Sequence, residues 1–366
     1  MLTLVAIAWS WSGSAYAQSN GAPRPEIVRL EAALQQYRQI AESGGWPEVP
    51  TGPTIEPGSR DHRVPILAQR LQSTGDLLGK RDAWPAYNED LQAAVTRFQA
   101  RHGLEPDARV GQATLRALNV TAEQRVQQLA INLERSRQVF KASRRDLLLV
   151  NIPAFEAYLV REGNTVWATR VIVGEADAET PVFEAELNQI VLNPTWAVPR
   201  SIATQDLLPM IKHDVGFLES GGFKLFTADG TTVSPIAVDW AALHEHNFPF
   251  TLVQRAGPQN ELGQVKFLFP NPHGVCMHDT PKKPLFSHYS RAYSHGCIRL
   301  DQPLELAQQL LKAEGWTRAE IDAQLASERT QPIVLAEPLP IVVTYLTARV
   351  DDTGTVLFYR DIYGRD

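Results

Sequence analysis

The chain has 366 residues, enough for roughly two or three domains of about 150 residues each. Apolar residues make up 44% and charged residues 21%, which is the balance of a folded globular protein and excludes a wholly disordered chain. With 35 Lys and Arg against 41 Asp and Glu, the net charge is −6, which argues against a nucleic-acid partner because such binding needs a basic surface. Two cysteines exclude a disulfide scaffold and a four-cysteine zinc module.

The first residues predict export. An apolar stretch, Leu2 to Trp11, is followed by Ala15-Tyr16-Ala17, the small-x-small pattern that precedes a signal-peptidase cut. The stretch is shorter than the roughly 20 apolar residues that a transmembrane helix needs, and no later stretch is long and apolar enough. We therefore expect a signal peptide over residues 1–17, with an uncleaved anchor or a buried helix as the alternatives.

The region from 18 to 145 reads as helical. Residues 18–61 predict one amphipathic helix, over 26–41, and then a linker rich in Gly and Pro. Residues 62–119 predict a compact bundle of three short helices. Residues 120–145 predict a longer connecting helix, because Thr121 and Gln124 have the S/T-x-x-E/Q spacing of a capping box.

From residue 146 the pattern changes to β-branched and aliphatic runs separated by turn residues, which predicts a mostly β domain. The expected strands are 147–152, 157–161, 166–173, 189–192, 265–269, 274–278, 341–348 and 356–359. Helices are expected over 201–216, 239–245 and 304–314, and a C-terminal tail over 349–366.

A polar cluster between His273 and Leu300 carries the candidate chemistry, with four histidines and both cysteines. Three arrangements compete there, beside the plain alternative of a buried core cysteine. A zinc site has the right ligand types, although the common C-x-x-C and H-x₃₋₅-H spacings are missing. A disulfide is allowed in an oxidising compartment, and a Cys–His nucleophile pair needs only two residues brought together by folding. The residues of these arrangements are Cys276, His278, His295 and Cys297.

The local sequence favours the nucleophile pair. In Ser294-His295-Gly296-Cys297, the glycine before the thiol permits a tight turn that can aim consecutive N–H groups at one point, as in an oxyanion hole. An imidazole beside a thiol, whose ordinary pKa is about 8.5, would raise its thiolate fraction. His278 ends a strand-like run and can approach Cys297 once the intervening loop folds back.

His278, followed sixteen positions later by the start of Ser294-His-Gly-Cys-Ile-Arg299, resembles the signature of the L,D-transpeptidase catalytic domain of the YkuD type. The resemblance extends over about 146–348 and includes Asn193-Pro-Thr-Trp196 and His278-Asp-Thr-Pro281. It implies an α+β multi-domain protein in which a helical bundle accompanies a mostly β, sandwich-like catalytic domain. The insertion over 198–263 resembles the helical capping subdomain of the larger Gram-negative members, which could screen a reaction intermediate from water.

The resemblance also implies roles for single residues. Cys297 would be the nucleophile and His278 the general base and acid, oriented by the backbone carbonyl of Asp279. The backbone N–H groups around His295, Gly296 and Cys297 would hold the oxyanion, and the substrate groove would be lined by Arg299, Trp196 and Tyr293. Cys276 departs from the nearest subgroup, where a tyrosine commonly stands. Because alternate strand residues share a face, Cys276 faces the same side as His278, and a disulfide to Cys297 would be labile and regulatory.

The bundle over 62–119 resembles the peptidoglycan-binding domain type 1. Together the two resemblances imply a periplasmic, wall-associated enzyme that forms 3–3 cross-links between diaminopimelate residues of peptidoglycan stem peptides. Its partners would be stem peptides and glycan, with other wall synthases and carbapenem-type inhibitors also expected. No metal and no cofactor is implied, because every step is acyl transfer. The alternatives are an L,D-carboxypeptidase, an enzyme that anchors proteins to the wall, and a non-catalytic wall-binding scaffold.

Overall fold

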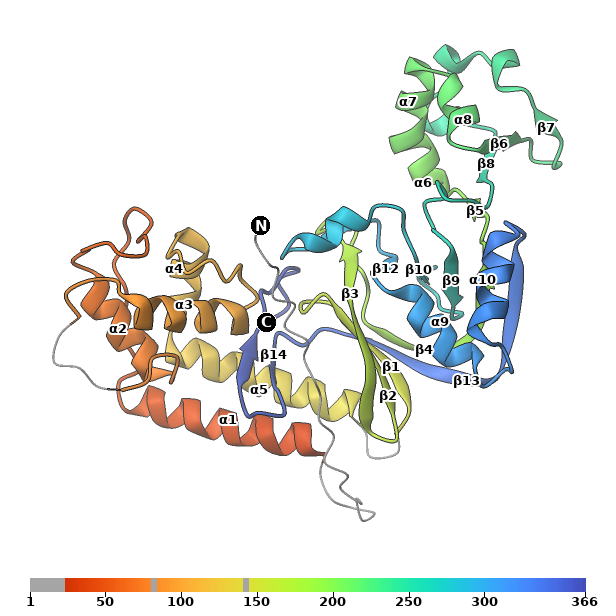
Figure 1. Cartoon of the computed structure of the whole chain (residues 1–366). Helices are drawn as coiled ribbons and strands as arrows, with labels where there is room; N and C mark the ends of the chain where they lie inside the picture. The colour runs from red at the N-terminus through yellow and green to blue at the C-terminus, as the bar shows by residue number, and fades with distance from the viewer. Residues whose placement is uncertain (1–23, 80–83, 141–144) are drawn as a thin grey trace.

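The computed structural model describes residues 24–79, 84–140 and 145–366, so the expected signal peptide lies outside the described residues. Figure 1 shows a helical region, a β-rich body and a smaller unit that projects from the body. The expected fold class, a helical N-terminal region with a mostly β domain, is confirmed. None of the helices in the described ranges has the length and apolarity that a membrane crossing needs.

Two long helices form one side of the helical region. Helix α1 (Pro25–Glu42) lies beside α5 (Ala122–Val139), and the expected capping box of α5 is present at Thr121 and Gln124. Both helices pack on a hairpin of β14 (Ala348–Val350) and β15 (Val356–Phe358), whose buried apolar side chains fill the space between them. The segment after 348 is therefore not a free tail, because Val350 and Phe358 belong to this core.

The three short helices expected over 62–119 are present as α2 (Val64–Ser73), α3 (Glu89–Arg101) and α4 (Gln112–Leu118). They enclose an apolar core of their own, which contains Leu67, Phe98 and Leu118. At its edge the bundle contacts the hairpin: His102 stacks on Phe358 with ring centroids 5.4 Å apart, and Arg101 Nη1 donates to the Val356 carbonyl.

The β-rich body is a nine-stranded sheet in the order β11-β3-β12-β10-β9-β4-β13-β1-β2, and β2 also pairs with β3, so the series of pairings closes on itself. Its strands are β1 (Leu147–Asn151), β2 (Glu156–Arg161), β3 (Asn164–Gly174), β4 (Phe183–Leu192), β9 (Val265–Leu268), β10 (Met277–His278), β11 (Ala292–Ser294), β12 (Ile298–Leu300) and β13 (Gln331–Thr344). Helix α9 (Pro303–Leu311) covers the core with Leu306 and Leu310, and α10 (Arg318–Ala326) adds Ile321.

The strand bounds differ from expectation where the sequence pattern is interrupted. Strand β13 begins ten residues before the expected 341 and includes Pro332, Pro338 and Pro340, residues that normally argue against a strand. Its register shifts between Val334 and Leu339, and that irregularity accommodates the proline-rich stretch. Helix α10 was not expected, since only two of its side chains, Ile321 and Leu325, are buried.

The projecting unit is an insertion between β4 and β9 (Val265–Leu268), and we call it the cap. It contains a four-stranded sheet of β5 (Trp196–Ala197), β8 (Thr251–Gln254), β6 (Phe223–Phe226) and β7 (Thr232–Val233). Helices α6 (Arg200–Ile202), α7 (Leu208–His213) and α8 (Gly216–Ser220) pack on this sheet around a separate apolar core, and a π-helical turn, Ala203–Leu207, joins α6 to α7. The cap is thus mixed rather than helical, and short 3₁₀ turns replace the helix expected over 239–245.

Candidate active site

Three neighbouring strands bring the candidate residues together. The two-residue strand β10 (Met277–His278) pairs in parallel with β12 (Ile298–Leu300) and antiparallel with β9, so that His278 lies between Arg299 and Lys266 in the ladder. Cys276 and Cys297 come directly before these paired positions. Since alternate residues of a strand share a face, one face of the sheet carries the side chains of Lys266, Cys276, His278, Cys297 and Arg299. We call it the site face.

His278 is held as a buried, neutral imidazole. Its Nδ1 donates a hydrogen bond of 2.5 Å to the Asp279 carbonyl, which leaves Nε2 as an acceptor. Burial, reinforced by the positive charge of Arg299, lowers the pKa of His278 to about 3. The ring is therefore uncharged at neutral pH and can accept a proton.

The carbonyl that orients His278 is itself anchored. The Asp279 carboxylate pairs with Lys283 Nζ at 2.7 Å and accepts the Gln264 N–H at 2.9 Å. Gly263 packs against this carboxylate so closely that a Cβ there would lie 2.3 Å from Asp279 Oδ2, and its φ of +59° also favours glycine. Asp279 thus contributes through its backbone while its side chain fixes the loop.

The thiol of Cys297 contacts the second cysteine. The two Sγ atoms lie 3.5 Å apart as free thiols; Cys276 is buried, whereas Cys297 is partly exposed. The Cys276 S–H lowers the pKa of Cys297 to about 6, and the same contact raises the pKa of Cys276 well above its ordinary value. Within the described residues no hydrogen bond joins Cys297 to the His278 ring, although catalytic contacts of this kind often tighten only when substrate binds.

Side-chain hydroxyls hold the turn before Cys297. Ser294 Oγ accepts the Gly296 N–H at 3.1 Å and donates to the Cys297 carbonyl at 2.5 Å. Thr180 Oγ1 donates to the Gly296 carbonyl at 2.8 Å, and Gly296 has a φ of +103° that a residue with a side chain rarely adopts. The Gly296 N–H is therefore already used, whereas the N–H groups of His295 and Cys297 have no hydrogen-bond partner in the described part of the chain.

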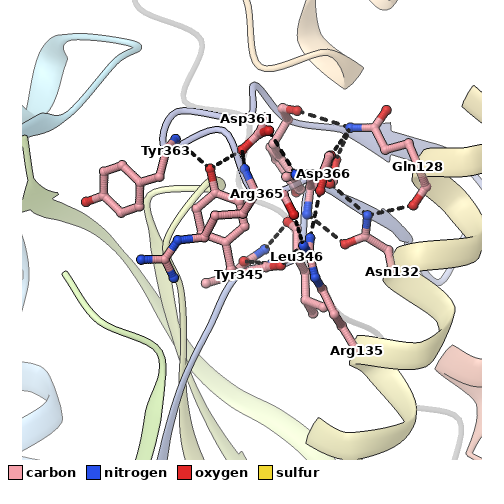
Figure 2. A network of polar contacts seen from close by, with 12 residues as sticks. Gln128, Asn132, Arg135, Tyr345, Leu346, Asp361, Tyr363, Arg365 and Asp366 are labelled. Carbon is pink, nitrogen blue, oxygen red and sulfur yellow. Dashed lines mark hydrogen bonds and ion pairs between the residues drawn. The ribbon is translucent and has the colours of Figure 1, made fainter. Parts of the chain in front are cut away.

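Thr180 is tied in turn to the C-terminal segment. Its N–H donates to the Tyr363 hydroxyl at 3.2 Å, and that hydroxyl donates to the Gly174 carbonyl. Figure 2 shows how this segment is fixed: Tyr345 contacts Asp361 and Tyr363, and Arg135 of α5 pairs with Asp366. A series of hydrogen bonds thus connects the helical region with the turn that carries Cys297.

Two cations on the site face, Lys266 and Arg299, have no ionic partner among the described residues. Both are partly buried, and Glu261, the acidic group that acts on Arg299, forms its own ion pair with Lys282 at 2.9 Å. Partly buried cations without a counter-ion favour an anion nearby, such as a thiolate or a substrate carboxylate.

The remaining expected residues make contacts outside the group of His278 and Cys297. His295 reaches across to the cap, where its Nε2 lies 3.2 Å from Asp206 Oδ2. Tyr293 is exposed and its hydroxyl contacts His288 Nδ1 at 2.9 Å. Trp196 is partly exposed and packs on the cap core beside Phe223.

The alternatives to a nucleophile pair can be compared with these contacts. Within the described ranges, no three His, Cys, Asp or Glu side chains are grouped as a metal ion requires. Both cysteines are free. Sequence reasoning missed Thr180 and Lys266, and for Thr180 no local signal exists because it lies 116 positions before Gly296.

Comparisons with known proteins agree with this arrangement. The model of the "L,D-transpeptidase catalytic domain" matches residues 145–333, and that of a "Putative peptidoglycan binding domain" matches residues 60–118. A protein of Haemophilus influenzae named "Putative L,D-transpeptidase" is 34% identical over 240 residues; the match covers 66% of this chain and about half (48%) of that protein.

Solved structures resemble the chain more distantly. The L,D-transpeptidase of Stackebrandtia nassauensis is 14% identical with a TM-score of 0.29, over 80% of this chain and 97% of that one. The catalytic domain of the Enterococcus faecium L,D-transpeptidase acylated by ertapenem is 13% identical with a TM-score of 0.25, over 55% and 98%. Both TM-scores are below 0.5, so the family assignment rests on the sequence matches.

Proposed function

Since the chain belongs to the L,D-transpeptidase family with the YkuD catalytic domain and also contains a peptidoglycan-binding domain, we propose that it forms 3–3 cross-links in peptidoglycan through a Cys297 thioester. The observation that carries the proposal is that a thiol of lowered pKa, just before β12, and a neutral imidazole on the parallel strand β10 lie on one face of the sheet. The donor would be a stem tetrapeptide and the acceptor a diaminopimelate side-chain amine.

In the first half-reaction, Cys297 Sγ attacks the carbonyl of the third stem residue, and the C–N bond to the terminal D-Ala breaks. A proton from water passes through His278 Nε2 to the leaving amine, so the products are a thioester and free D-Ala. In the second half-reaction, an amine attacks the thioester, the C–S bond breaks to release the Cys297 thiolate, and the amine proton passes through His278 to solvent. No redox step and no reagent other than water is needed for this balance.

Two backbone N–H groups suit the oxyanion of each tetrahedral intermediate. Among the residues that the structure describes, nothing accepts from the N–H groups of His295 and Cys297, whereas that of Gly296 already donates to Ser294. We therefore assign the oxyanion to His295 and Cys297 and give Gly296 the task of permitting the turn.

Arg299 and Lys266 would bind a carboxylate of the donor stem. Their unpaired charges lie on the face of Cys297 and His278, and stem peptides that contain diaminopimelate and D-Ala carry carboxylates near the reacting carbonyl. Arg299 offers a bidentate fork for such a group, and Lys266 a point charge.

The cap would separate transfer from hydrolysis. His295, next to the nucleophile's turn, contacts Asp206 of the cap, so a closed cap would lie over the thioester and limit the entry of water. The bundle over 62–119 would hold the enzyme on the wall, which fits the expected export to the periplasm and a location at the cell wall.

The test is muropeptide analysis of isolated peptidoglycan incubated with the purified protein. We expect 3–3 dimers and released D-Ala with the wild-type chain, and neither with Cys297→Ala. Ertapenem should add covalently to Cys297 of the wild type and not to the variant. Release of D-Ala without dimers would instead indicate an L,D-carboxypeptidase, transfer to a protein amine would indicate wall anchoring, and the absence of any adduct would indicate a non-catalytic scaffold.

The wall-binding part has a separate test on the full chain. In Cys297→Ala, soluble glycan fragments should slow amide hydrogen exchange in residues 62–119, whereas stem tetrapeptides should do so around Cys297. Protection by glycan confined to the catalytic domain would contradict the assignment.

A further inference from the structure

Cys276 is the feature of the site that the proposed reaction does not use. It precedes β10 directly, and its carbonyl accepts the Ile298 N–H at 3.0 Å, which fixes the segment before β10 beside β12. Its side chain is 8% exposed, and its Sγ lies 3.5 Å from that of Cys297. The contact between the two sulfurs therefore has either a packing role or a chemical one.

We propose that Cys276 is a positioning residue whose S–H donates to Cys297 Sγ and holds that sulfur as an anion on the site face. The proposal rests on the proposed function, because it assigns Cys297 as the nucleophile. Cys276 keeps its own proton throughout the reaction and forms no covalent bond in it.

The direction of donation follows from the surroundings of the two sulfurs. Cys276 is the more deeply buried, so a charge on it would lose more hydration than a charge on Cys297. The main-chain N–H of Cys276 also lowers the pKa of Cys297, so both hydrogens of Cys276 favour the same anion. Two thiols in contact cannot both ionise readily, and the less buried one takes the charge.

In the absence of substrate, His278 is poorly placed to stabilise the Cys297 thiolate. It has no hydrogen bond to Cys297, and burial beside Arg299 keeps its ring uncharged. A thiolate–imidazolium pair, the usual means of activating a cysteine, would add a third positive charge beside Lys266 and Arg299. Donation by Cys276 therefore separates two tasks: Cys276 stabilises the thiolate, whose own proton has gone to solvent, and His278 passes a proton from water to the leaving amine.

The charges around Cys297 point the same way. Lys266 comes from β9 and Arg299 from β12, and both lower the pKa of Cys297. The nearby carboxylates are already paired: Glu261 with Lys282, Glu179 with Arg365, Asp279 with Lys283 and Asp206 of the cap with His295. The neighbourhood is thus positive and suited to an anion.

The experiment measures the rate of Cys297 alkylation by iodoacetamide between pH 4.5 and 9.5, followed by mass spectrometry of the Cys297 peptide. The wild type should show a midpoint near pH 6. Cys276→Ala should move the midpoint up by one pH unit or more, which lowers the rate at pH 6 by about fivefold. Cys276→Ser keeps a hydroxyl donor and should restore a low midpoint.

The alkaline end of the profile separates this role from simple damage. A thiolate of higher pKa is the more nucleophilic, so above pH 9 Cys276→Ala should react as fast as the wild type or faster. A distorted site would be slower at every pH. His278→Gln should leave the alkylation midpoint within about half a unit while abolishing transpeptidation.

Alkylation needs no peptidoglycan, so this experiment tests the role of Cys276 independently of the proposed substrate. An unchanged midpoint in Cys276→Ala would overturn it, and so would a midpoint that moves with His278→Gln instead. Cys297→Ser measures the background alkylation of Cys276, which should stay slow because that thiol is buried and its pKa is raised.

Discussion

The hydroxyl of Thr180 donates a hydrogen bond of 2.8 Å to the carbonyl of Gly296, the residue before the candidate nucleophile. The same hydroxyl accepts the Gly174 N–H at 2.9 Å, so a single buried oxygen holds the end of β3 and the turn of Cys297 in one geometry. The conformation of the turn before Cys297 therefore depends on a residue outside the signature.

Replacing Thr180 by Val should slow the acylation of Cys297 by ertapenem about tenfold. The change keeps the shape but leaves two buried backbone groups without a partner, which costs about 1–3 kcal/mol for each group. Thr180→Ser is the matched control and should stay within about twofold of the wild type. Stopped-flow or mass-spectrometric acylation rates check this, and equal rates for Val and Ser would remove Thr180 from the positioning of the turn.

His278 should make the fold less stable in mild acid. Its folded pKa of about 3 lies below the ordinary 6.5, so below pH 6.5 the unfolded chain takes up a proton that the folded chain refuses. Stability should fall by up to about 1.4 kcal/mol per pH unit as the pH drops from 6.5 toward 3, and should be unaffected by this group above 6.5. By pH 5 the loss is about 2 kcal/mol.

Urea unfolding of His278→Gln at pH 7 and pH 5 checks this, because the variant lacks the titrating ring. Its change in unfolding free energy between the two pH values should be about 2 kcal/mol smaller than that of the wild type. His102, another buried histidine of lowered pKa, remains in both proteins. The exposed His213 provides the control: if His213→Gln flattened the profile equally, the loss would not belong to His278.

Lys266 and Arg299 should make Cys297 prefer anionic reagents. We expect iodoacetate to alkylate Cys297 faster, relative to neutral iodoacetamide, than it alkylates a free cysteine, and we expect added salt to reduce this preference. Lys266→Gln and Arg299→Gln should each lower the ratio of the two rates severalfold. Lys212→Gln, on α7 of the cap, should not change it. A ratio that neither site variant changes would contradict the carboxylate site.

The contact of the two sulfurs also predicts a reversible response to oxidants. A disulfide-forming oxidant such as diamide removes two electrons and two protons from Cys276 and Cys297 and joins sulfurs that already lie 3.5 Å apart. Ertapenem acylation should then be lost and should return with dithiothreitol. Cys276→Ser should keep its activity in diamide, whereas irreversible loss in both proteins would indicate direct oxidation of Cys297.

How far the sequence predicts this molecule depends on how local each feature is. The capping box of α5 was predicted correctly because Thr121 and Gln124 are one turn apart. The His278 and Cys297 candidates came from a contiguous signature and an alternating strand. Thr180 and Lys266 could not be found in that way, because the first acts through a fold-dependent contact and the second through strand pairing that no local pattern specifies. A strand over 356–359 was predicted and is present as β15, but its packing could not be predicted locally, since its partners are helices near the other end of the chain.

Asn193 and Gln264 stand at the two ends of the cap, and the N–H of Asn193 donates to the Gln264 carbonyl at 2.8 Å. The flanking strands β4 and β9 pair directly from Leu192 and Val265 onward, so the whole cap occupies the turn of an ordinary hairpin. A hairpin turn is a position where a chain accepts additions of almost any length at little cost. Evolution can therefore enlarge, exchange or lose the cap while the strands that carry His278 stay as they are. Selection on the surface of the cap can proceed with little effect on the strands beneath it.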